Sequence, residues 1–185
     1  MSEQDRVRWN RRYAETELED DPPSLLVELL ERWPIEGTAL DIAGGTGQAA
    51  AFLTSAGHDV VLVDISGVAL ELARQRSVGP GRLTLLESDL EAQPLPEGPF
   101  DLIVCSNFLD RRVLEQVPAR LRPNGLFFFI HPTVRNLERN PKPSRRFLLE
   151  EGEAASLLAT TLELLEVAES WRAGRHLMQL VGRRT

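Results

Sequence analysis

The sequence is poor in the residues that build disulfides and metal sites. Its 185 residues include one cysteine, Cys105, and three histidines, His58, His131 and His176. A single cysteine forms neither a disulfide framework nor a cysteine zinc site within one chain. The histidines lack the spacing of metal ligands. We therefore expect no metal site, and we expect Cys105 to be a small core residue.

Long apolar runs are also missing. No stretch approaches the roughly 20 apolar residues that cross a bilayer, and the first residues, MSEQDRVRWNRRY, are charged, unlike those of a secretory signal. Hydrophobic residues make up 42% of the chain and charged residues 26%, as in one soluble domain of this length. We expect a cytoplasmic protein that does not associate with membranes.

An overall excess of positive charge is absent, because the formal net charge is −7. This argues against nucleic acid as the main partner. Residues 111–146 differ, with nine basic residues against two acidic ones. This segment is either a solvated surface or a place where arginine recognises an anionic substrate, with Arg111, Arg145 and Arg146 as candidates.

Two helices are predicted at the start of the chain, over residues 5–18 and 25–33. The prolines of DDPP (20–23) end the first. Ser24 is expected to cap the second, and Pro34 follows it.

Short apolar runs then alternate with helical segments, which predicts a parallel sheet covered by helices on both faces. Strands are expected at 38–43, 58–65, 82–87, 100–105 and 126–130. Helices are expected at 47–56, at 67–75 with Ser66 as its cap, and at 111–121 before a turn at 122–125.

The C-terminal third follows a different pattern. A basic loop is expected over 132–146 and a helix over 151–162. Strands at 164–171 and 176–183, joined by a tight turn at Ala173-Gly174, predict an antiparallel hairpin. The predicted fold class is a three-layer α/β/α sandwich with a Rossmann-like, mostly parallel seven-stranded sheet that ends in this hairpin. It forms a single domain with N-terminal helices (1–33), a cofactor-binding core (38–130) and a helix plus hairpin (147–185).

A glycine-rich segment, DIAGGTG (41–47), follows the first predicted strand. Gly44, Gly45 and Gly47 allow backbone angles that other residues avoid and let a ligand approach closely, and the next helix offers its unpaired N–H groups. Ligands bind at the carboxyl ends of strands in such sheets. Taken alone, the segment also fits a dinucleotide-binding pattern, so the glycines are a weak signal.

Acidic residues follow the next two strands. Asp64 can accept hydrogen bonds from both hydroxyls of a ribose, which suits a nicotinamide or an adenosyl cofactor equally; the alternative is a strand-end carboxylate in water. Asp89 can accept the exocyclic amino group of adenine, with Leu90 against the ring edge, or it can simply cap the following turn.

The segments ALDIAGGTG, VDIS, ESDL, FDLIVCSNFLDR and LRPNGLFFFI, in this order and spacing, resemble the class I S-adenosylmethionine-dependent methyltransferases over residues 38–130. Ala43 stands where that family usually has its first glycine. The resemblance implies S-adenosylmethionine as cofactor, S-adenosylhomocysteine as product, and a role for Asp41 in orienting the loop and the methionine amino end. It implies these cofactor-binding residues: Asp41, Ala43, Gly44, Gly45, Gly47, Asp64, Ile65, Ser66, Asp89, Leu90, Ser106 and Asn107.

A narrower resemblance rests on WNRRY, NFLDRRVL and NPKPSRRFLLEEGE. These segments are similar to small single-domain methyltransferases of the tellurite-resistance type, which act on small acceptors, often soft nucleophiles. In that group the N-terminal helix tends to cover the cofactor as a lid. Trp9 and Tyr13 would then close the pocket, or they would pin the helix to the core. Asn107 and Arg111 are expected to face the methyl donor and the acceptor.

The leading hypothesis is methyl transfer from S-adenosylmethionine to a small molecule by in-line displacement. An amine or hydroxyl acceptor would need a general base; His131 is the candidate, and a structural histidine is the alternative. One rival is a nicotinamide-dependent oxidoreductase, which is disfavoured because only one mononucleotide-binding half precedes the hairpin. A non-catalytic S-adenosylmethionine-binding domain is another. The identity of the acceptor and the oligomeric state stay open.

Overall fold

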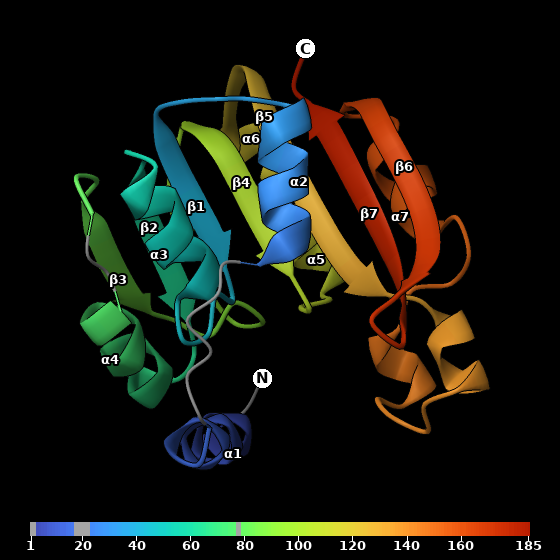
Figure 1. Ribbon diagram of the computed structural model, residues 1–185, viewed down its shortest axis with the longest axis horizontal. Coiled ribbons are helices and arrows are strands. Elements are labelled where there is room, and N and C mark those ends of the chain that lie inside the picture. The colour runs from blue at the N-terminus through green and yellow to red at the C-terminus, as the bar shows by residue number, and fades with distance from the viewer. Residues whose placement is uncertain (1–2, 17–22, 77–78) are drawn as a thin grey trace.

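The structure, a computed structural model, describes residues 3–16, 23–76 and 79–185. Its seven-stranded sheet has the order β3-β2-β1-β4-β5-β7-β6, and β7 pairs antiparallel with both of its neighbours (Figure 1). This confirms the predicted sheet and its C-terminal hairpin. The strands are β1 (Thr38–Ile42), β2 (Asp59–Asp64), β3 (Leu83–Glu87), β4 (Phe100–Ser106), β5 (Leu121–Pro132), β6 (Glu163–Arg172) and β7 (Arg175–Arg183).

Helices cover both faces of the sheet, as predicted. Alternate strand residues point to opposite faces, and they form two apolar cores. Leu26 and Leu53 belong to one core, whereas Val113, Phe127 and Leu158 belong to the other. The helices of the first layer are α2 (Ser24–Arg32), α3 (Gln48–Ser55) and α4 (Gly67–Arg76), and those of the second are α5 (Arg111–Leu114), α6 (Val117–Arg120) and α7 (Glu153–Leu158).

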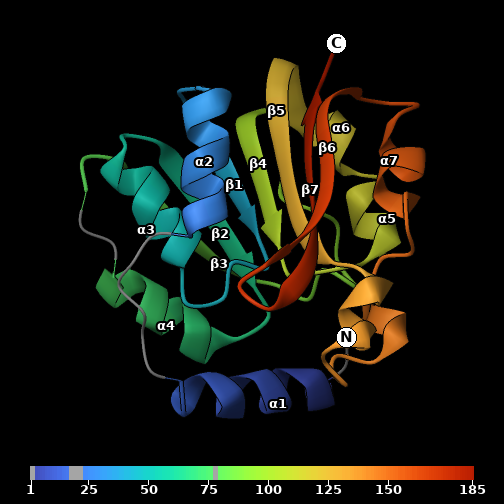
Figure 2. The same cartoon turned by 45° about the vertical axis from the view of Figure 1, so that its right-hand side comes forward.

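The first helix, α1 (Glu3–Ala14), belongs to neither layer. It lies beyond the carboxyl ends of the parallel strands, next to α4 (Figures 1 and 2). None of its residues is fully buried. The prediction of a helix over residues 5–18 is wrong at both ends, because α1 begins at Glu3 and ends at Ala14, before a turn at Glu15. Its predicted end at DDPP (20–23) falls mainly on residues 17–22, which lie outside the described residues.

Capping explains where two helices begin. The Ser66 hydroxyl oxygen accepts a hydrogen bond from the Ala69 N–H at 3.1 Å, so Ser66 caps α4 as predicted. The same prediction for Ser24 is wrong. Pro23 holds the cap position without a side-chain hydrogen bond, its carbonyl accepts from the Val27 N–H at 3.1 Å, and Ser24 is already helical.

The helix predicted over 111–121 is also wrong in extent. α5 ends at Leu114, α6 begins at Val117, and Leu121 already belongs to β5. Pro118 has no N–H to donate to the Leu114 carbonyl, so one continuous helix cannot form. The predicted turn at 122–125 lies inside β5, where the register with β4 shifts.

The segment after β5 is more regular than the predicted loop over 132–146. It contains two 3-10 helices, η1 (Val134–Glu138) and η2 (Arg145–Phe147). Asn136 anchors the segment, donating to the Lys142 carbonyl and accepting from the His176 N–H. The helix predicted over 151–162 shrinks to α7, because Gly152 has a left-handed φ of 71°. A turn follows α7, in which the Thr161 N–H bonds the Leu158 carbonyl.

Candidate functional site

The site lies where the strand order reverses. The chain goes from β1 outward to β3, then returns to place β4 on the other side of β1. In open α/β sheets this reversal leaves a crevice at the carboxyl ends of the strands, where ligands bind. The glycine loop, residues 43–47, leaves β1 at this point and leads into α3.

The glycine loop has a backbone that requires small residues. Gly45 and Gly47 have φ values of 54° and 74°, and Ala43 has 51°. A Cβ on Gly44 would stand 2.5 Å from an oxygen of Asp41, and one on Gly47 would stand 2.6 Å from the Ala73 Cβ. Glycine is therefore required at positions 44 and 47 for the loop to pack against Asp41 and Ala73.

Asp64, at the end of β2, holds the glycine loop in place. One of its oxygens accepts from the Gly45 N–H and the other from the Ser66 N–H, each at 2.9 Å. Burial raises the pKa of this carboxyl group, although the two N–H donors counteract the rise. Each oxygen has a second lone pair, so Asp64 can also accept hydrogen bonds from a ligand's hydroxyls.

Asp41, at the end of β1, is buried, and its carboxylate is not fully hydrogen-bonded among the described residues. Its Oδ2 atom has no hydrogen-bond partner among the described residues. Burial, followed by the nearby Asp64, raises the pKa of Asp41 to about 7. A buried acceptor without a partner costs free energy, and a cationic ligand group beside the pair would favour the ionised forms. These features fit an adenosyl cofactor with a positively charged end.

Helix α1 covers the loop. The Tyr13 hydroxyl lies 2.7 Å from the point where a Cβ on Gly45 would stand, and burial, with Asp64 next, raises its pKa to about 12. Tyr13 stacks on Trp9 at 5.7 Å between ring centroids. Asn10 joins α1 to the start of α4, accepting from the Ser66 hydroxyl at 2.6 Å. Sequence reasoning missed Asn10, because nothing local marks it.

The acid after β3 takes part in a turn. Asp89 Oδ1 accepts from the Glu91 N–H at 3.0 Å, and its carbonyl accepts from the N–H groups of Ala92 and Gln93. The turn-capping alternative is therefore present in the structure. Leu90 is buried, and the contact of both residues with adenine stays a prediction.

The segment after β4 faces the last strand. Asn107 has a left-handed φ of 60°, and its N–H donates to the Ile130 carbonyl. Its Oδ1 accepts from Arg175 Nη2 at 2.8 Å, and its Nδ2 donates to the Ser106 hydroxyl at 3.2 Å. Arg175 was not predicted as a site residue.

His131 is buried beside this segment. Its Nε2–H donates to the Phe147 carbonyl at 2.9 Å, which leaves Nδ1 as the basic nitrogen. Nδ1 has no partner among the described residues. Burial, and then nearby Arg175 and Arg111, lower the pKa of His131 to about 4. So weak a base contributes little near neutral pH, which favours the structural alternative.

The three predicted substrate arginines have partners of their own. Arg111 donates to Glu153 at 2.6 Å and Arg145 to Glu150 at 2.7 Å, and Arg146 lies over the Phe147 ring at 4.4 Å. The structure does not gather them into one cluster around a common point. Glu153, which belongs to α7, was not predicted as a partner.

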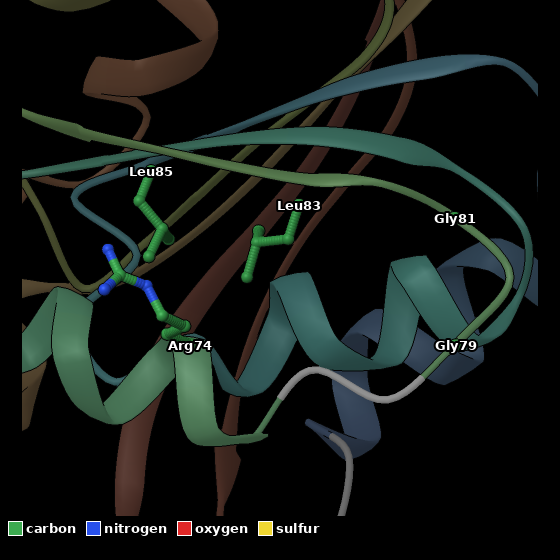
Figure 3. Close-up of a pocket in the computed structure, with 5 residues that line it drawn as sticks. All are labelled: Arg74, Gly79, Gly81, Leu83 and Leu85. Carbon is green, nitrogen blue, oxygen red and sulfur yellow. The ribbon is translucent and has the colours of Figure 1, made fainter.

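A pocket of about 380 Å³ lies elsewhere, between α4 and β3 (Figure 3). It is lined by Arg74, Gly79, Gly81, Leu83 and Leu85, and none of these is a predicted site residue. Within the described ranges, no group of three or more histidine, cysteine or acidic residues is placed to hold a metal. None of the helices in the described part of the chain is long and apolar enough to cross a membrane.

Residues 39–125 match a family model described as a methyltransferase domain. A demethylmenaquinone methyltransferase of Thermus thermophilus is 31% identical over 127 residues, which cover 64% of this chain and 51% of that protein. The chain spans about half the length of the curated relatives it matches.

Solved structures share the fold at lower identity. The N-methyltransferase NodS of Bradyrhizobium japonicum, in complex with S-adenosylhomocysteine, has a TM-score of 0.76 at 18% identity, covering 97% of each chain. A TehB-like methyltransferase of Corynebacterium glutamicum has a TM-score of 0.66 at 21% identity, covering 99% of this chain and 97% of that one.

This sheet, with its reversed β7, is the fold of the class I methyltransferases, whose cofactor is S-adenosylmethionine. Within this fold, residues 39–125, which include the glycine loop and Asp64, match a methyltransferase domain family.

Proposed function

We propose that the protein transfers a methyl group from S-adenosylmethionine to a small-molecule acceptor. The observation that carries the proposal is the acidic pair at the strand reversal, where Asp64 holds Gly45 and Asp41 keeps an unpartnered oxygen beside it. The Thermus relative, named for methylating demethylmenaquinone, supports a small organic acceptor, and the net charge of −7 supports an acceptor other than nucleic acid. A cytoplasmic location stays a prediction.

The chain's own residues would mainly bind and orient. Asp64 would accept the ribose hydroxyls, Asp41 would face the amino end through its unpartnered oxygen, and α1 with Tyr13 would exclude water. The cofactor supplies a methyl group on a sulfonium, and the electron pair of the broken carbon–sulfur bond stays on sulfur. Positioning of the two reactants can account for roughly 7–11 kcal/mol of the barrier.

The acceptor would lose its proton before or during transfer. His131, with a pKa of about 4, is a weak base for this. The low pKa supports an acceptor that needs little help, such as a thiol that reacts as its thiolate. We propose that such a soft nucleophile lies beyond Asn107, on the side of β4 that faces β5 and β7.

A thermal-shift comparison tests the proposed function. S-adenosylmethionine and S-adenosylhomocysteine at about 100 times their Kd should each stabilise the protein by about 2.7 kcal/mol, which is about 5–10 °C for a chain of this size. The nicotinamide cofactors should not. Stabilisation by a nicotinamide cofactor alone would favour the oxidoreductase. Adenosyl binding without S-adenosylhomocysteine formation over a panel of thiols, amines and carboxylates would indicate a binding domain.

A further inference from the structure

Arg175 reaches the acceptor side of the site from the far end of the chain. It is the first residue of β7, and because β7 is antiparallel, it lies at the carboxyl ends of the other strands. Ile42 of β1 pairs with Cys105 of β4, so Gly44 and Asn107 each lie two residues beyond that pair. Arg175 contacts Asn107 at this level. Asn107 follows β4, the strand next to β1, whereas β7 lies beyond β5.

Arg175 differs from its neighbours in having no acidic partner. Arg111 pairs with Glu153, and Arg172, at the other side of the hairpin turn, pairs with Glu28 at 3.1 Å. Among the residues that the structure describes, no carboxylate lies within ion-pair distance of Arg175. Its hydrogen-bond partner is the neutral amide of Asn107.

The surroundings of Arg175 favour the arrival of an anion. Arg175 is exposed, so an anion can reach its guanidinium from solvent. Partial burial lowers the pKa of the guanidinium, and no counter-charge offsets the effect. A carboxylate would supply the missing counter-charge. The guanidinium has five N–H donors, of which the bond to Asn107 takes one. The remaining donors match the two oxygens of a carboxylate.

We propose that Arg175 recognises a carboxylate on the methyl acceptor and that Asn107 positions its guanidinium. The left-handed backbone of Asn107, held by the Ile130 carbonyl, fixes the amide oxygen that Arg175 contacts. Arg175 is thus a specificity residue rather than a catalytic one. This inference rests on the proposed function, because it assigns the acceptor subsite of that reaction.

Binding of a simple carboxylate tests the inference. The wild-type protein saturated with S-adenosylhomocysteine is titrated with benzoate, or with neutral benzyl alcohol, and the melting temperature is followed. We expect benzoate to stabilise the protein and benzyl alcohol to have a much smaller effect. Arg175→Gln should weaken benzoate binding about tenfold or more, the scale of a charge-assisted pair. Arg175→Lys, which keeps the charge but loses the fork, should fall between.

Arg172→Gln is the matched control, since it lies in the same hairpin but has its own acidic partner; benzoate binding should be unchanged. If benzoate and benzyl alcohol act alike, or if both arginine variants lose benzoate equally, the subsite is not at Arg175. The titration is repeated without S-adenosylhomocysteine. Failure of S-adenosylhomocysteine to stabilise the wild type would contradict the proposed function, whereas the response to Arg175→Gln judges the subsite alone.

Discussion

The two acidic residues on the proposed cofactor side of the site, Asp64 and Asp41, are held in different ways. Asp64 is already engaged by two backbone N–H groups, so it serves the loop even without a ligand. Asp41 has a buried oxygen without a partner among the described residues, so its surroundings favour the neutral form until a cation arrives. Asp64 thus anchors the glycine loop, whereas Asp41 favours the binding of a cationic group.

Replacing Asp64 tests the ribose assignment. Asp64→Asn keeps the shape of the side chain but removes the charge and one acceptor. We expect S-adenosylhomocysteine to bind at least about tenfold more weakly by calorimetry, because hydrogen bonds to a carboxylate are lost. Asp59→Asn is the control, since Asp59 lies at the opposite end of β2 and is exposed. Equal affinity in both variants would mean that Asp64 does not bind the ribose.

Among the elements, α1 is the one whose place depends on few contacts. It has no fully buried residue, and it meets the domain through Asn10 at α4, Tyr13 at the glycine loop and an ion pair of Arg6 with Glu87 at 3.8 Å. A helix held in this way can open at a low free-energy cost. We therefore propose that α1 is a lid, which is one of the two roles that the narrower resemblance implies, with Tyr13 as the residue that lies over the glycine loop.

Asn10→Ala should loosen this lid. Loss of the hydrogen bond from the Ser66 hydroxyl should cost about 1 kcal/mol, so amide hydrogens of α1 should exchange about fivefold faster, while those of β1 and β4 stay protected. Arg11→Ala, on the exposed side of α1 with only a surface pair to Glu15, should change exchange little. Equal exchange in the wild type and Asn10→Ala would show that Asn10 does not hold the helix.

At the scale of the whole molecule, local patterns predicted the fold and part of the site. Asp41 and Asp64 follow apolar runs directly, so their meeting at one sheet edge follows from parallel strand order. The contact of Arg175 with Asn107 spans 68 residues, and that of Asn10 with Ser66 spans 56. No local sequence pattern predicts contacts over such separations. The break at Pro118 had a visible signal, but the apolar periodicity of the flanking residues hid it.

The pH dependence of stability should show two opposing contributions. The pKa of Asp41 rises from 3.8 to about 7, so the folded state binds its proton more tightly and stability falls as pH rises through that range. The pKa of His131 falls from 6.5 to about 4, so stability falls as pH drops from about 6.5 toward 4. The two contributions are at most about 4 and 3 kcal/mol, and they oppose each other between pH 4 and 6.5.

Variants should separate these contributions in urea unfolding measured across this pH range. Relative to the wild type, Asp41→Asn should make the free energy of unfolding rise more steeply with pH, because the His131 contribution is less opposed. His131→Gln should tilt the profile the other way. Burial also raises the pKa of Asp64, which adds to the Asp41 side in both variants. Profiles parallel to the wild type would show that neither group is coupled to folding.

The strand order also brings together parts of the site that are synthesised at different times. β1, which leads into the glycine loop, lies between β2 and β4 in the sheet. β7, which carries Arg175, is the last of the described strands in chain order and docks against β5. Because a domain generally folds as a unit, the glycine loop and the proposed acceptor subsite would come together only after β7 has been synthesised.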